Sequence, residues 1–172
     1  MDDQKTTPGK FGVNFGLILG GIMILIAIIM YATDMAFKGQ QWPVYIYYVV
    51  FPTMIIYTMR QYKKHNANTL LFTDALKTGI IVALISSLVY VGYIFIFNYI
   101  IDTGYNEKII DFSIDQIAES DAPVEAKEMS LKMVKFFSDP LAGSAIWIAL
   151  SLFFGLIYSM IGGLVMKTSS QD

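Results

Sequence analysis

The sequence contains no cysteine and only one histidine, His65. The missing cysteine excludes disulfides, thiolate metal sites, thiol nucleophiles and a lipidated anchor cysteine. His65 cannot form a metal site with its own kind, and it stands beside Lys63 and Lys64 with no carboxylate nearer in the sequence than Asp74. We therefore interpret His65 as a solvated side chain rather than a catalytic base, and we expect no metal site and no cofactor.

Charge is also scarce. Only 15% of the 172 residues are charged, whereas a soluble domain carries roughly 25%, and 55% are hydrophobic. The mean hydropathy is +0.55. The net charge of −2 argues against nucleic acid as a partner. This composition is typical of a single integral membrane domain, residues 1–172, whose first partner is the lipid bilayer.

Four apolar runs are long enough to cross a membrane as helices. They predict transmembrane spans at about 11–32, 42–60, 75–101 and 140–166. The first run is too long for a signal peptide, and "YATDMAFKG" after it is a poor cleavage site. The interiors of the spans hold no ionisable residue, which argues against an ion pump within one monomer. The predicted fold class is an all-α bundle of four transmembrane helices.

Residues 102–139 form the one sizeable polar segment, which "SDAP" divides into two amphipathic pieces. We predict a helical hairpin in the long extracytoplasmic loop between the third and fourth spans, followed by an N-cap and a proline in "SDP". Asp111, Asp115 and Glu119 recur at four-residue spacing on one helical face. Such carboxylates can bind a cation weakly, catalyse hydrolysis as an acid pair, or contact a basic partner. No supporting glycines, histidines or EF-hand spacing accompany them, so a solvated face or a partner contact is preferred.

Lysine and arginine predict the orientation. The 38-residue loop carries nine acidic residues and only four lysines, whereas most of the basic residues lie on the opposite side. The positive-inside rule then places both termini in the cytoplasm and the hairpin outside. The basic residues of the cytoplasmic side are Lys5, Lys10, Arg60, Lys63, Lys64, Lys77 and Lys167.

Three of the four spans carry small residues at four-residue intervals. Such stripes let helix backbones approach closely in lipid. We expect the first, third and fourth spans to pack on one another, with the second at the edge. The alternative is that the stripe of the first span docks a partner or a second copy. The stripes are Gly12, Gly16 and Gly20; Ala75, Gly79, Ala83 and Ser87; and Ser151, Gly155, Ser159 and Gly163.

The second span has no such stripe and is rich in aromatic residues instead. Pro52 falls in its middle and is expected to kink the helix. If the protein holds a partner or ligand inside the membrane, Tyr47, Phe51 and Pro52 are the residues we expect to contact it.

The order of these features resembles a known family. Its most telling parts are "LLFTDALKTGIIVALISSLVY", which opens the third span, and the loop form "IIDFSIDQIAES…EAKEMSLKMVKFFSDP". Together they resemble the domain-of-unknown-function 4199 family, small four-helix membrane proteins typical of Bacteroidota. The resemblance covers nearly the whole chain. It implies a multi-pass protein of the bacterial inner membrane, and it supplies no reaction and no catalytic residues.

Three functions remain open from the sequence. The first is a non-enzymatic accessory or scaffold subunit of a membrane assembly, which binds other membrane proteins. The second is a small oligomeric carrier or channel, whose path forms between copies of the chain. The third is an enzyme acting on lipid-linked substrates. No catalytic constellation is visible, so the first is preferred.

Overall fold

The computed structural model describes residues 7–38, 40 and 42–168, and within these residues all regular structure is helical. Lys5, used above for orientation, lies outside the described residues. In chain order the helices are α1 (Pro8–Ala32), η1 (Met35–Lys38), α2 (Trp42–His65), α3 (Phe72–Ile96), η2 (Phe97–Ile101), α4 (Tyr105–Glu119), α5 (Val124–Ser138) and α6 (Pro140–Met166).

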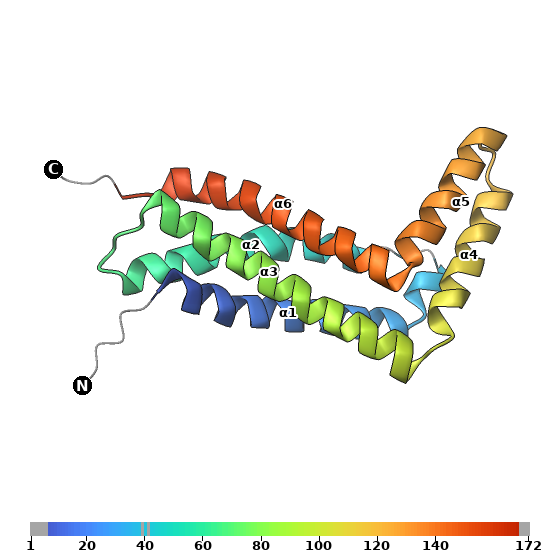
Figure 1. Cartoon of the computed structure of the whole chain (residues 1–172), viewed down its shortest axis with the longest axis horizontal. Helices are drawn as coiled ribbons and strands as arrows, with labels where there is room; N and C mark the ends of the chain where they lie inside the picture. The colour runs from blue at the N-terminus through green and yellow to red at the C-terminus, as the bar shows by residue number, and fades with distance from the viewer. Residues whose placement is uncertain (1–6, 39, 41, 169–172) are drawn as a thin grey trace.

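Four of these segments are long and apolar enough to span a membrane: α1, α2, α3 with its continuation η2, and α6. They contain 24 to 30 residues, which at about 1.5 Å per residue exceeds the roughly 30 Å hydrocarbon core of a bilayer. They lie side by side, with both chain ends at one end of the bundle and α4 and α5 at the other (Figure 1). Large apolar side chains such as Leu25 and Val165 point outward. The protein is an integral, multi-pass membrane protein.

The glycine stripe of α1 packs against α3. A Cβ atom added to Gly12, Gly16 or Gly20 would lie 2.7 Å from a side-chain atom of α3. The atoms met belong to β-branched residues at the same four-residue spacing, so a ridge on α3 fits a groove on α1. The α3 residues that form this ridge are Ile81, Ile85 and Val89.

The opposite face of α3 packs against α6 through small residues on both helices. Gly163 faces Ala75, Ser159 faces Gly79, and Gly155 faces Ala83, so the two helices run antiparallel. The Ser159 hydroxyl donates to the carbonyl of Gly155 at 2.5 Å, which satisfies it within its own helix. Ser87 and Ser151, the remaining members of these stripes, are also buried.

The sequence predicted that the first, third and fourth spans pack on one another. In the structure α3 lies between α1 and α6 and carries the main contacts with both. The reason is that α3 has two packing faces a half-turn apart, one formed by a β-branched ridge and the other by a small-residue stripe. The predicted packing rested on the small-residue stripe alone.

The second helix, which was expected at the edge of the bundle, contributes buried side chains to its interior. Ile55 and Met59 of α2 are fully buried, and Phe51 is nearly so. These large side chains fill the space beside the small residues of α3 and α6, because Ile55 approaches Gly79 and Met59 approaches Gly162. Large side chains of α2 therefore pack at the positions where α3 and α6 carry small residues.

Several boundaries differ from those predicted. Helix α2 continues beyond residue 60 to His65, where the Lys63 ammonium donates to the Met166 carbonyl at 2.8 Å. His65 is exposed at that helix end, with its ring 5.2 Å from that of Phe11. Helix α6 spans 140–166 as predicted, and the Asp139 carboxylate accepts a hydrogen bond from the backbone of Ala142 at 2.7 Å.

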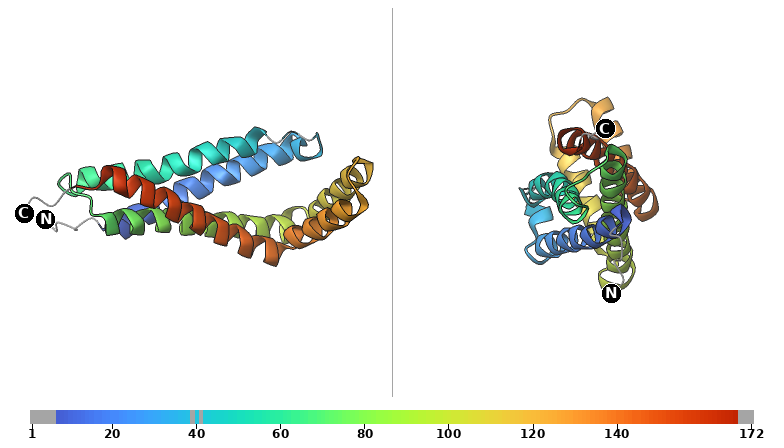
Figure 2. Two further views of the ribbon diagram at one scale, coloured as in Figure 1. Left: turned by 90° about the horizontal axis from the view of Figure 1, so that it is seen from above. Right: turned by 90° about the vertical axis from the view of Figure 1, so that its left-hand side faces the viewer.

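The bundle is not uniformly tight along its length. Near the chain ends the helices are close, whereas toward α4 and α5 the pair α1 and α2 diverges from the pair α3 and α6 (Figure 2). The contiguous hydrophobic core includes Met59, Leu70 and Ala75 together with the aromatic residues Phe51 and Tyr62. The diverging half holds large aromatic side chains, and it contains the cavities described next.

Candidate ligand-binding cavity

A cavity of about 440 Å³ lies where the helices diverge, at the end of the bundle that carries α4 and α5. Its walls come from α1, from α3 with η2, and from α6, and the beginning of α4 and the end of α5 cover it. Pockets of about 300–1,000 Å³ are the size that binds small molecules. Most of its aromatic lining is contributed by Tyr31, Tyr90, Tyr93, Phe97, Tyr105 and Trp147.

These rings contact one another in an unbroken series. The Trp147 ring centroid lies 5.4 Å from that of Tyr90, and Tyr93 lies 5.6 Å from Phe97. Phe97 in turn contacts Tyr31 at 4.9 Å and Tyr105 at 5.4 Å, both edge to face. Such geometries add about 0.5–1.5 kcal/mol each beyond burial. The rings therefore hold the cavity walls in place without the small-residue contacts of the other half.

Helix periodicity and one π-helical turn position the lining. Tyr90, Tyr93 and Phe97 share a face at intervals of three and four residues, and η2 then closes with the Asp102 amide donating to the Phe97 carbonyl at 2.9 Å. Single π turns inside α-helices are rare and frequent at functional sites. At Gly143 an added Cβ would collide with the carbonyl of Phe137, so only glycine lets α6 begin so close to the end of α5.

Two buried polar atoms in this lining have no hydrogen-bond partner: the Ser144 Oγ and the Trp147 Nε1. Ser144 is only 5% exposed. Leaving a buried polar group unpaired costs about 1–3 kcal/mol in proteins. The indole N–H is a donor only, so the group that satisfies Trp147 has to be an acceptor.

Three other polar side chains around the cavity are hydrogen-bonded. The Tyr31 hydroxyl donates to Asp102 Oδ2 at 3.1 Å, Asn98 Nδ2 donates to the Ile94 carbonyl at 2.8 Å, and Asn106 Nδ2 donates to the Ser138 carbonyl at 2.8 Å. Burial raises the pKa of Tyr105 above its ordinary value of 10, so its hydroxyl is protonated at neutral pH. Ser144 and Trp147 differ from Tyr31, Asn98 and Asn106, because their buried polar atoms have no hydrogen-bond partner.

The cavity reaches the outer surface of the bundle. Two of its lining residues are well exposed there, Phe137 at 53% and Leu150 at 46%. Leu150 lies within α6, a membrane-spanning segment, so this side of the opening faces lipid.

The aromatic residues predicted on the second span line a neighbouring space. Tyr47, Phe51 and Pro52 border a cavity of about 150 Å³ between α2 and α6. Trp147 borders this cavity as well as the large one, with its ring centroid 5.4 Å from that of Tyr47. A third space of about 150 Å³, between α1 and α2, also has Tyr47 and Trp147 in its wall. Trp147 is therefore the junction of the three.

The predicted acidic residues lie elsewhere. Asp111, Asp115 and Glu119 are all exposed on α4, and none of them lines the large cavity. Within residues 7–38, 40 and 42–168, no group of three or more histidine, cysteine, aspartate or glutamate side chains is placed to hold a metal ion. The structure thus brings Tyr47 and Phe51 to the cavities and leaves the acidic stripe facing away.

Neither Trp147 nor Ser144 was singled out in the sequence analysis above. A signal was present, because Pro140, Gly143, Ser144 and Trp147 fall on one helical face by their spacing. That face combines a small residue, a hydroxyl and an indole, which is unlike the apolar faces beside it. Only the structure shows that α1 withdraws from this face and leaves it lining a hollow.

The family described as "Protein of unknown function (DUF4199)" matches residues 14–168, nearly the whole chain. No curated protein and no solved structure matches the chain. The match runs from within α1 to just beyond the end of α6, and so includes most of α1, all of α2 to α6 and every residue of the large cavity. The chain belongs to the DUF4199 family.

Proposed function

We propose that this protein is a non-enzymatic membrane protein that binds one amphipathic lipid in the cavity beside Trp147. The observation that carries the proposal is the pair of unpartnered donors, Ser144 Oγ and Trp147 Nε1, in the wall of an aromatic cavity of about 440 Å³. A lipid oxygen that accepts a hydrogen bond from one of these donors would remove the cost of leaving that donor unpaired.

The cavity constrains the chemistry of its occupant. The wall is mainly aromatic and aliphatic, so it favours an apolar chain or ring. The donors require an acceptor oxygen, of which the carbonyl of an acyl ester or of a quinone is the kind found at the edge of a bilayer. We therefore propose a carbonyl-bearing lipid, and the experiment below separates its two sources. This develops the carrier alternative, with the site inside one chain rather than between copies.

The proposal includes a location and an orientation. We place the protein in the bacterial inner membrane with both termini in the cytoplasm and α4 and α5 outside. The support is the cluster of basic residues at the end of α2, Arg60, Lys63 and Lys64, opposed to the acid-rich segment at the other end of the bundle. The cavity then opens to the outer leaflet.

Trp147 itself reports on binding. The chain has two tryptophans, so Trp42→Phe leaves Trp147 as the sole indole fluorophore. Purified protein in detergent is titrated with a phospholipid brominated on its acyl chain and, separately, with a long-chain quinone, because both quench indole fluorescence. We expect saturable quenching with one of the two. In that background Ser144→Ala should raise the lipid concentration at half-saturation about fivefold, because it removes one hydrogen bond of roughly 1 kcal/mol.

Two controls make the result specific. Ser159→Ala removes a hydroxyl from the same helix whose bond is internal to α6, and it should leave half-saturation unchanged. Ala27→Phe places a large ring in the wall of the cavity and should abolish saturable quenching. Ala32→Phe makes the same change at an exposed position near the end of α1 and should leave the quenching saturable. Quenching that stays linear, or that is equal in the Ala27→Phe and Ala32→Phe variants, contradicts a bound lipid.

A second proposal keeps the role of an accessory or scaffold subunit. It is supported by the way α4 and α5 project beyond the bundle (Figure 1) with Asp111, Asp115 and Glu119 exposed on α4. A basic surface of another membrane protein, or of a second copy, would complement that face. A stoichiometric partner in the native mass, lost at high salt and lost when the three acids are replaced by alanine, would support this role. A native mass without a partner counts against it.

A further inference from the structure

Helix α5 has apolar side chains on two opposite faces. Leu131 and Val134 are partly buried on the side that packs against α4. On the other side Met129, Met133 and Phe136 recur at intervals of four and three residues, and their exposed fractions are 62%, 51% and 57%. Phe137, 53% exposed, adjoins them. An apolar face of this size normally has a partner.

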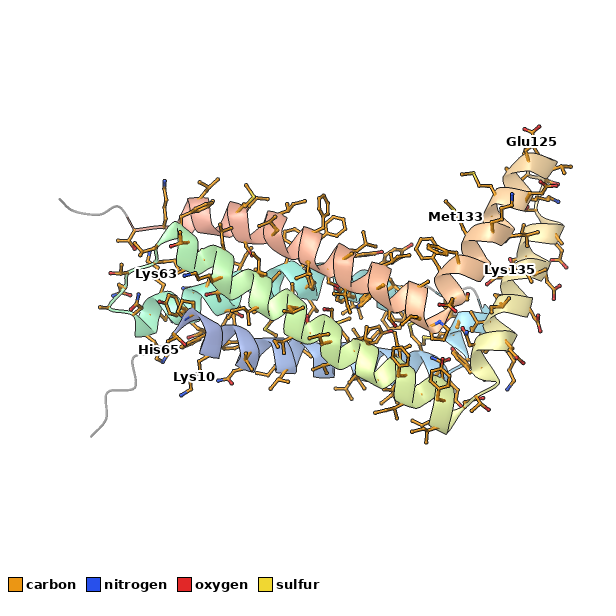
Figure 3. The ribbon with its side chains drawn as sticks, in the orientation of Figure 1. Lys10, Lys63, His65, Glu125, Met133 and Lys135 are labelled. Carbon is orange, nitrogen blue, oxygen red and sulfur yellow. The ribbon has the colours of Figure 1, made fainter. Side chains whose placement is uncertain are left out.

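The position of this face is shown in Figure 3. Met133 points away from α4, on the side of α5 from which α6 runs back along the bundle. Glu125 marks the far tip of the hairpin. The face thus looks along the outer surface of α6, which carries Leu141 and Phe153, exposed at 72% and 57%. Phe137 of α5 and Leu141 of α6, both exposed, lie on either side of the Asp139–Pro140 turn, so exposed apolar side chains follow one another from α5 to α6.

We propose that α5 lies on the surface of the same bilayer that α6 crosses, with Met129, Met133, Phe136 and Phe137 in contact with lipid. The continuity with the membrane-spanning surface selects lipid as the occupant, because any molecule that covers α5 here also has to displace the lipid beside α6. The depth is that of an interfacial helix, about 5–10 Å into the boundary between headgroups and acyl chains.

The charges on the hairpin fit this arrangement. Helix α5 carries Lys127, Lys132 and Lys135 against two acidic residues, Glu125 and Glu128, so it is the more basic helix. Helix α4 carries the acidic stripe, and its projecting part lies on the side of α5 that faces away from α6 (Figure 1). Lys132 and Lys135 are exposed on α5, and exposed lysines on a helix with an apolar face favour an anionic membrane surface, whereas acidic residues are best placed away from it. The Lys127 ammonium donates to the Ala118 carbonyl at 2.8 Å and ties the two helices together.

The absence of cysteine makes the test direct. Single cysteines are introduced by Met133→Cys on α5 and, as the matched control, by Asp115→Cys on the exposed face of α4. Each is labelled with an environment-sensitive fluorophore and reconstituted as the full chain into vesicles of zwitterionic and anionic phospholipid. A nitroxide attached near the top of the acyl chain serves as quencher. Thermal unfolding of each labelled variant verifies that it is folded.

We expect the label at position 133 to emit at shorter wavelength and to lose most of its fluorescence to the nitroxide lipid. The label at position 115 should show neither change. Emission typical of water at position 133 overturns the proposal, because the face would then be free. A blue shift without nitroxide quenching also overturns it, since a protein or a second copy would then cover the face. This test is independent of the lipid-binding cavity, whose occupancy the label at 133 does not report.

Discussion

Replacement of Gly79 by leucine is expected to unfold the bundle, whereas Gly92→Leu is expected to leave it folded. A Cβ at position 79 would overlap the hydroxyl of Ser159 on α6 and come within 3.0 Å of Ile55 on α2. Both neighbours are fully buried, so neither can swing away into lipid. Overpacking of this kind costs typically 1–3 kcal/mol and more when helices have to separate, and we expect about 3 kcal/mol or more here.

Gly92 provides the matched comparison on the same helix. Nothing lies within 4 Å of a Cβ added there, and the residue is exposed. Both substitutions remove a glycine from α3, which by itself favours the helix by up to about 1 kcal/mol. Thermal unfolding in detergent measures the difference. Equal melting temperatures for the two variants would mean that α3 and α6 do not pack as described.

Gly16→Leu is expected to destabilise the bundle at its other main interface. The added Cβ would lie 2.7 Å from the Cβ of Ile85 and 3.1 Å from the Val82 carbonyl oxygen. Both of these atoms are fixed to the backbone of α3, so no rotamer change relieves the contact. We expect a loss of about 2–3 kcal/mol, read as a lower melting temperature, while Gly21→Leu, with nothing within 4 Å, changes little.

The same variant decides between the two interpretations of the α1 stripe. If Gly16→Leu stays folded alone but loses a partner, the stripe docks that partner; if the isolated chain unfolds, the stripe serves packing within the bundle. A second pair sharpens the result. Gly16→Ala should be destabilising alone and less so with Ile85→Gly, which removes the atoms it meets. A coupling of zero between positions 16 and 85 would contradict contact between them.

Much of the fold could be predicted because lipid imposes strong rules on sequence. An uncharged apolar run of sufficient length forms a spanning helix, and Asp139 with Pro140 marks the start of α6 to the residue. The partner of each stripe was harder to predict. A stripe of glycines can receive either another stripe or a β-branched ridge, and the choice of Ile81, Ile85 and Val89 for α1 depends on how α3 is shared by two neighbours.

The candidate site could be predicted only in part, for a related reason. Tyr47 and Phe51 of the second span were predicted as contact residues, and they border one of the smaller cavities. The larger cavity is lined by the other three spans, the beginning of α4 and the end of α5. Ser159 and Thr78 each donate to the carbonyl four residues earlier, whereas Ser144 has no partner. No local sequence pattern separates these cases. The difference arises from the divergence of α1 from α6, which is a property of the whole bundle.

The proposed function requires one lipid in the cavity beside Trp147. The most direct test is the native mass of the detergent-extracted protein and of its Ala27→Phe and Ala32→Phe variants. We expect the unaltered protein and Ala32→Phe to be monomers that each retain one carbonyl-bearing lipid. We expect Ala27→Phe to be a monomer without the lipid. The same retained lipid in all three proteins, or none in any of them, would contradict it.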